Sequence, residues 1–310
     1  MSESQADAFS SVPPPLIDGV GRLLIALPML VYPVLHFIYT DFVASIIPPW
    51  IPWHLFWTYF TALTIFAAGL AILFKKVAQL AAALLAVEIL LFCLLIHLPL
   101  LFHSPANEWA HRQMFGDMPS RVNNAFKDFG LSGAVFLFAG AQSGRWRVSG
   151  RDSLSTFGLA IVSISIVGFA IVHFVNPAFA PGIPPMEVSI GFPLPAHLFW
   201  VYLSAIALLV LTIGLWVRST SARAALILAV TILFFELLTW IPDFVAHPGG
   251  LVGNWLKDLG IIGGLMISYS ALTEYRATPG EAPSSDRFRS HDAPVNDSRT
   301  EVQSRRMAVT

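Results

Sequence analysis

The hydrophobic positions of this chain form long, nearly uninterrupted stretches, with few polar residues inside them. A helix needs roughly 20 apolar residues to cross a bilayer core about 30 Å thick. Eight segments reach or approach that length: 18–38, 55–74, 77–99, 126–143, 154–175, 197–217, 222–242 and 256–273. The pattern predicts an all-α integral membrane protein with eight transmembrane helices.

Charged and proline-rich stretches separate the later spans. Arg151 and Asp152 precede the fifth span, and the segment 176–195 follows it. The segment from Arg218 to Arg223, basic at both ends, separates the sixth span from the seventh, and the segment 242–254 separates the seventh from the eighth. These breaks support separate helices of membrane-spanning length.

The two ends of the chain are predicted to be tails. Residues 1–17 lack a basic cluster, and no small-residue cleavage site follows the first apolar stretch, so we expect that helix to be retained. Residues 274–310 are rich in Ser, Asp and Arg, a composition typical of disorder. With a cytoplasmic N-terminus, 14 of the 18 Lys and Arg residues fall inside. The positive-inside rule therefore predicts two cytoplasmic termini.

Composition narrows the class of protein. The chain is 55% hydrophobic and only 12% charged, with mean hydropathy +0.68. Soluble domains carry about a quarter charged residues. We therefore exclude a soluble enzyme, a disordered scaffold and a nucleic-acid-binding protein, and expect the lipid bilayer as the main partner. Cys93 is the single cysteine, which excludes disulfide chemistry by this chain alone.

The chain also repeats itself. The residues His-Leu-Phe-Trp at 54–57 recur at 197–200, and His36-Phe37 recurs as His173-Phe174. This order predicts two four-helix repeats, 18–143 and 154–273, joined by a basic cytoplasmic linker at 144–153. Four helices is an even number, so the repeats enter the membrane in the same sense, as in parallel-repeat transporters.

A family resemblance rests on the same residues. A first helix that ends in His36-Phe37, a Pro/Trp-rich loop over 46–53 and a second helix that ends at the basic pair Lys75-Lys76 resemble the DoxX-like membrane proteins. The resemblance covers each half of 18–273. It implies four-helix bundles that accompany thiosulfate:quinone oxidoreduction or other respiratory and detoxification systems. The segment 62–69 lacks the acidic residue that members of this family usually carry there.

Two acidic residues lie inside apolar spans. Glu88 is twelve residues beyond Lys76 and Glu236 is thirteen beyond Arg223, so both are expected deep in the bilayer. An intramembrane carboxylate is costly and suggests a functional site, such as a proton relay or a quinol-facing group. The alternative is a neutral carboxylic acid that hydrogen-bonds to a neighbouring helix.

The duplicated histidines lie at the predicted outer ends of the helices: His36, His54, His173 and His197. Neighbouring Trp and Tyr residues favour an interfacial aromatic belt. A haem site needs two histidines that face each other, and a metal site needs three or more convergent ligands. No His-x-x-x-His spacing occurs on one predicted helix. We therefore predict no metal site and keep haem only as an alternative.

An Asn-x-x-Lys-Asp pattern begins the fourth and eighth predicted helices: Asn124, Lys127 and Asp128, and Asn254, Lys257 and Asp258. The asparagines are interpreted as N-caps, with the aspartates in the favourable first turn. Each lysine is expected to form a salt bridge with a neighbouring helix or loop, or to extend to the membrane surface. Contact with an anion or a lipid headgroup is the alternative.

The sequence names no substrate. We expect a DoxX-like accessory subunit of a redox or respiratory system, with a partner protein and without catalysis of its own. A small-solute or proton-coupled carrier is the first alternative, because deep carboxylates accompany two parallel repeats. A quinone- or haem-binding oxidoreductase is the second, although no cofactor is required by the sequence.

Overall fold

The computed structural model describes residues 14–75, 77–102, 118–143, 152–177, 197–246 and 253–277, and this part of the chain is helical without strands. The elements before residue 118 are α2 (Pro14–Ile38), α3 (Thr40–Ile46), α4 (His54–Leu73), α5 (Ala78–Phe92), the π-helical turn η2 (Cys93–His97) and α6 (Leu98–Leu100). The later elements are α8 (Met118–Gln142), α10 (Ser153–Val175), α11 (His197–Trp216), α12 (Ser221–Ala246) and α13 (Gly253–Ala277). The predicted all-α class is confirmed for these residues.

Within the described residues, six helical segments are long and apolar enough to cross a membrane: Pro15–Ile38, His54–Leu73, Ala78–Leu100, Ser153–Val175, Leu198–Trp216 and Ser221–Leu238. They correspond to six of the eight predicted spans. The other two predicted spans, 126–143 and 256–273, lie within α8 and α13, which carry Lys-Asp pairs in their apolar stretches. That these two helices also cross, and that both termini are cytoplasmic, stays a prediction.

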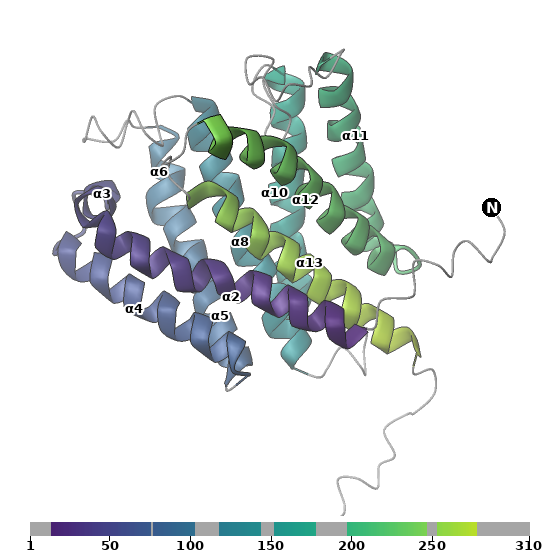
Figure 1. Ribbon diagram of the computed structural model, residues 1–310, viewed down its shortest axis with the longest axis horizontal. Helices are drawn as coiled ribbons and strands as arrows, with labels where there is room; N and C mark the ends of the chain where they lie inside the picture. Colours follow the sequence, from purple (N-terminus) through teal and green to yellow (C-terminus); the bar gives the residue numbers. More distant parts are fainter. Residues whose placement is uncertain are drawn as a thin grey trace, which may run out of the picture. The chain divides into compact units, whose positions relative to one another are not determined.

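The helices α8 and α13 are the most enclosed part of the described chain. Every residue from 130 to 140 of α8 is buried. α8 packs against α5, α10 and α13, while α13 packs against α2, α8 and α12. Figure 1 shows α2 and α13 running side by side. These two less apolar helices are therefore surrounded by the more apolar ones.

The surrounding helices turn apolar side chains outward. Leu63 of α4, Leu84 of α5, Ile213 of α11 and Val230 of α12 are all more than half exposed. In water such a surface would be unfavourable, but in a bilayer lipid chains cover it. The exposed faces are thus suited to lipid contact.

Small residues allow the central helices to approach closely. A Cβ atom added to Gly264 of α13 would lie 2.5 Å from the Cβ atom of Ala134 of α8. A Cβ atom added to Gly263 would lie 2.5 Å from the backbone oxygen of Gly21 of α2. Close backbone packing of this kind is typical of membrane helix pairs.

Similar aromatic contacts occur in the two halves of the chain. Phe37 stacks on Tyr59 with ring centroids 5.4 Å apart, and Phe174 stacks on Tyr202 at 5.8 Å. The contact of α2 with α4 thus has a counterpart between α10 and α11. In each half, the phenylalanine comes directly after a duplicated histidine.

A π-helical turn at Cys93–His97 interrupts the regular ladder between α5 and α6. Pro99 follows two residues later and has no backbone N–H to donate to the preceding turn. π-helical turns insert a residue and re-aim the side chains beside them, often at functional sites. Here the turn directs His97 toward α8, where it contacts Asp128.

Candidate functional site

The two Lys-Asp pairs meet each other across the central helices. Lys127 Nζ of α8 forms a salt bridge with Asp258 Oδ2 of α13, and Lys257 Nζ of α13 lies 2.8 Å from Asp128 Oδ1 of α8. Each lysine therefore pairs with the aspartate of the other helix. The expectation that the lysines find partners outside their own dipeptides agrees with these contacts, and both are buried salt bridges.

Three further side chains extend this arrangement. His97 Nε2 contacts Asp128 Oδ2, Glu236 Oε1 of α12 lies 3.7 Å from Lys127 Nζ, and Asn124 Oδ1 accepts a hydrogen bond of 3.3 Å from Lys257. We call these seven residues the charged cluster: His97, Asn124, Lys127, Asp128, Glu236, Lys257 and Asp258. The Glu236 side chain is 12% exposed and the other six residues are no more than 8% exposed.

Burial explains why the charges occur in pairs. An ionised side chain taken out of water is stable only with a partner of opposite charge and further hydrogen bonds. Asp128 has Lys257 and His97 as such partners, and Lys127 has Asp258 and Glu236. The cluster thus joins η2, α8, α12 and α13 through polar contacts inside an apolar bundle.

The N-cap interpretation of Asn124 is wrong. α8 begins at Met118, so Asn124 lies inside the helix, is 1% exposed and binds Lys257 instead of capping. Asp128 consequently lies beyond the first turn, and the salt bridge, rather than the helix dipole, compensates its charge. Asn254 is the second residue of α13, and its side chain is outside the described residues, so its N-cap interpretation stays a prediction.

Glu88, the other deep acid, forms its hydrogen bond outside the charged cluster. Its Oε1 accepts a hydrogen bond of 2.6 Å from Thr64 Oγ1 of α4. The predicted partner on a neighbouring helix is therefore present. Glu88 also lines a cavity, so its carboxyl group borders both Thr64 and that cavity.

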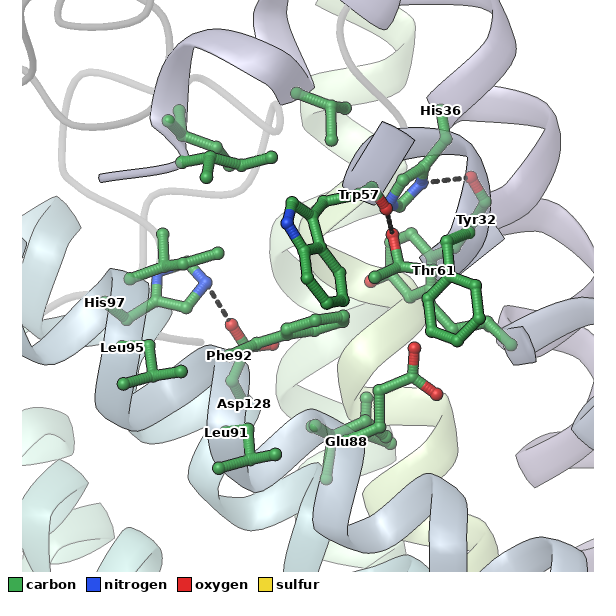
Figure 2. Close-up of a pocket in the computed structure, with 18 of the residues that line it drawn as sticks. Tyr32, His36, Trp57, Thr61, Glu88, Leu91, Phe92, Leu95, His97 and Asp128 are labelled. Carbon is green, nitrogen blue, oxygen red and sulfur yellow. Dashed lines mark hydrogen bonds and ion pairs between the residues drawn. The ribbon is translucent and has the colours of Figure 1, made fainter. Parts of the chain in front are cut away.

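This cavity has a volume of about 720 Å³ and lies among α2, α3, α4, α5 and the central helices. Its walls are largely aromatic and aliphatic, with Trp57, Phe60 and Phe92 among them. Figure 2 shows Trp57 and Phe92 between His97–Asp128 on one side and Tyr32, His36 and Thr61 on the other. The polar lining consists of Tyr32, His36, Tyr39, Thr61, Glu88, His97, Asp128 and Lys257. The site is thus an apolar chamber with polar groups at separate places.

The cavity reaches the charged cluster directly. His97, Asp128 and Lys257 belong both to the cluster and to the cavity lining. On the side of the charged cluster, a molecule in the cavity would therefore contact the ion pair of Lys257 and Asp128. On the other side it would contact groups that are uncharged or have a single hydrogen-bond partner. The sequence pattern did not predict His97 as part of this site. The nearby Pro99 was the available signal, because it predicts a distorted helical turn.

The duplicated histidines do not behave alike. His36 lines the cavity and its Nδ1 lies 2.8 Å from the backbone oxygen of Tyr32. His173 is 1% exposed, with its Nδ1 3.0 Å from Ser204 Oγ of α11, so its assignment to an interfacial belt is wrong. His54 begins α4 and is half-buried, and the side chain of His197 is outside the described residues.

Comparisons of the chain with protein-family models, with curated proteins and with solved structures give no match. Among the residues that the structure describes, no three His, Cys, Asp or Glu side chains converge as metal ligands. The cavity and the charged cluster beside it are therefore the features of this chain that bear on function.

Proposed function

We propose that this membrane protein binds a lipid-soluble ring compound of the quinone type in the cavity beside the charged cluster. The observation that carries the proposal is the cavity of about 720 Å³, whose aromatic walls end at the His97–Asp128–Lys257 group. Ligand sites are commonly apolar chambers of this size with a few polar groups that orient the ligand.

The walls favour a flat, uncharged ring. Trp57, Phe60 and Phe92 offer aromatic faces on which a ring stacks in offset or edge-to-face geometry. The surrounding Leu84 and Leu91 suit a hydrocarbon chain. A ligand that partitions into lipid would reach these residues from the bilayer, because they belong to helices of membrane-spanning length.

The charges beside the cavity favour a ligand with an uncharged polar head group over a ligand with a phosphate. Lys257 is already paired with Asp128 at 2.8 Å, so the lysine does not supply a surplus positive charge to an anionic headgroup. Its ammonium group has three donors, two of which Asp128 and Asn124 use, and the third suits a ligand carbonyl oxygen. The oxygen of a quinone or quinol head accepts such a hydrogen bond without bringing a charge, whereas a phosphate would bring a second negative charge beside Asp128.

We also propose the wider setting of the site. The repeated sequence, the cross-paired lysines and the matching Phe37–Tyr59 and Phe174–Tyr202 contacts support a DoxX-like tandem duplication. In that setting the protein is an accessory subunit of a redox or respiratory system in a bacterial inner membrane, with eight spans and cytoplasmic termini. It holds a quinone for a partner protein that carries out the electron transfer.

A proton-coupled carrier is the second candidate, and the charged cluster favours it. Buried carboxylates paired with lysines between helices are found on ion and proton pathways. Transport of protons by the purified protein in liposomes, with loss on Glu236→Gln, would support the carrier. Quinone binding without such transport would support the binding protein.

The test of quinone binding uses the full chain in nanodiscs and a short-chain ubiquinone as probe. Leu91 lines the cavity, so Leu91→Trp fills it and is expected to weaken binding at least tenfold. Leu94 is similarly exposed on the same helical segment but does not line the cavity, so Leu94→Trp is the matched control. No measurable binding by the wild type, or equal loss in both variants, would refute the proposal.

A further inference from the structure

We infer that His36 is the hydrogen-bond acceptor that makes the cavity select the hydroxyl form of its ligand, the quinol, over the carbonyl form. The inference rests on the proposed ligand site and adds the chemical form that the site prefers. It is carried by the hydrogen-bond roles of three side chains on the α2–α4 side of the cavity: His36, Thr61 and Glu88.

The tautomer of His36 follows from its partner. Its Nδ1 lies 2.8 Å from the backbone oxygen of Tyr32, and a carbonyl oxygen only accepts hydrogen bonds. Nδ1 must therefore carry the proton. In a neutral imidazole the other nitrogen, Nε2, then has a lone pair and acts as an acceptor.

The surroundings of His36 favour this neutral form. In the described part of the chain, the His36 ring makes the Tyr32 hydrogen bond and no ion pair. The charged groups that share the cavity are engaged elsewhere: Glu88 with Thr64, and Asp128 with Lys257 and His97. An imidazolium in an apolar chamber would lack a counter-ion, which is costly.

Thr61 adds a second acceptor beside His36. Its single hydroxyl proton is directed to its own helix, where Oγ1 lies 2.8 Å from the backbone oxygen of Trp57. Figure 2 shows this hydrogen bond together with the one from His36 to Tyr32. The Thr61 oxygen therefore presents lone pairs to the cavity. Two acceptors on one side call for a donor on the ligand, and a quinol hydroxyl supplies it whereas a quinone carbonyl does not.

His173, the counterpart of His36 in the second half of the chain, also has a hydroxyl-bearing residue beside it. Ser204 occupies the position of Thr61 in the repeated sequence, and its Oγ lies 3.0 Å from His173 Nδ1 and 2.7 Å from the backbone oxygen of Val201. In both halves the histidine therefore uses Nδ1 for a hydrogen bond within the protein. The difference is that His36 lines the cavity, whereas His173 is 1% exposed and does not line it, so the selective site is expected at His36.

The experiment compares three probes with the same ring and side chain: a short-chain ubiquinol, the corresponding ubiquinone and the dimethyl ether of the quinol. Binding to the full chain in nanodiscs is measured under anaerobic conditions. One net hydrogen bond corresponds to roughly a three- to tenfold difference in affinity. We expect the wild type to bind the quinol more tightly than both other probes by about this factor.

Variants assign the preference to His36. His36→Phe removes the acceptor and is expected to lower quinol affinity to the level of the ether while leaving ubiquinone affinity unchanged. His36→Gln keeps an acceptor oxygen and is expected to retain part of the preference. His54→Phe is the control, because His54 is half-buried but does not line the cavity. Helical content and a monodisperse elution profile establish that each variant is folded.

The outcomes separate the two claims. Equal binding of quinol, quinone and ether by the wild type, or an equal loss of all three in His36→Phe, would overturn the role of His36 and leave the proposed site intact. Failure of the wild type to bind any probe would overturn the proposed function and, with it, this inference.

Discussion

The pairing of Lys257 with Asp128 across α8 and α13 gives the sharpest quantitative prediction. The two groups are 2.8 Å apart and each side chain is 9% exposed, so solvent screens the pair little. Lys257→Met leaves the Asp128 carboxylate without its lysine and is expected to cost about 3–5 kcal/mol of unfolding free energy. Asp128→Asn should cost a similar amount, because it leaves the lysine buried without its counter-ion.

A double-mutant cycle measures the pairing itself. Lys257→Met combined with Asp128→Asn removes both charges, so the double variant should lose less than the sum of the singles by roughly 1–3 kcal/mol. The matched cycle uses Lys127→Met with Asp128→Asn, two neighbours in sequence that pair with different partners. Its coupling energy should be clearly smaller. Unfolding free energies come from reversible denaturation in mixed micelles. A larger coupling within the dipeptide than between the helices would refute the cross-pairing.

Two other predictions concern packing and topology. Gly264→Leu should cost at least about 1–3 kcal/mol, because any Cβ at this position meets Ala134 at 2.5 Å. Gly19→Leu, whose added Cβ would have no heavy atom within 4 Å, should change the unfolding free energy little. A reporter fused after Ser104 is expected to be active only if it functions in the periplasm, since the eight-span prediction puts the segment that contains Ser104 outside. A reporter active only in the cytoplasm at this position would contradict the eight-span prediction.

The apolar pattern predicts the helices well because twenty consecutive apolar residues have few alternatives to a membrane helix. The predicted segments 55–74 and 154–175 agree with α4 and α10 to within one residue at each end. The prediction is least accurate at α8, which begins at Met118 rather than near 126. The polar residues Asn124, Lys127 and Asp128 read as a helix start because they interrupt the apolar run, whereas they are interior residues that bind α13 and η2.

The candidate site was predicted only as separate residues. The charges at Lys127, Asp128, Lys257 and Asp258 indicated salt bridges, but spacing along the chain does not reveal which helices cross. His97 could not be assigned to Asp128 because the regular helical period fails at the π-helical turn that aims it. The cavity arises from side chains of several helices, and a one-dimensional pattern carries no information about such a space.

The central position of α8 has a consequence for how the chain is made. Lys127 and Asp128 emerge from the ribosome about 130 residues before their partners Asp258 and Lys257, and each charged residue at the centre of a lone membrane helix opposes insertion by about 2.5–3.5 kcal/mol. On the eight-span prediction, α8 is therefore expected to insert stably only after α13 has been made. Chains that stop before α13 should be cleared by membrane proteases, whereas a separately expressed 152–310 fragment should rescue them in trans.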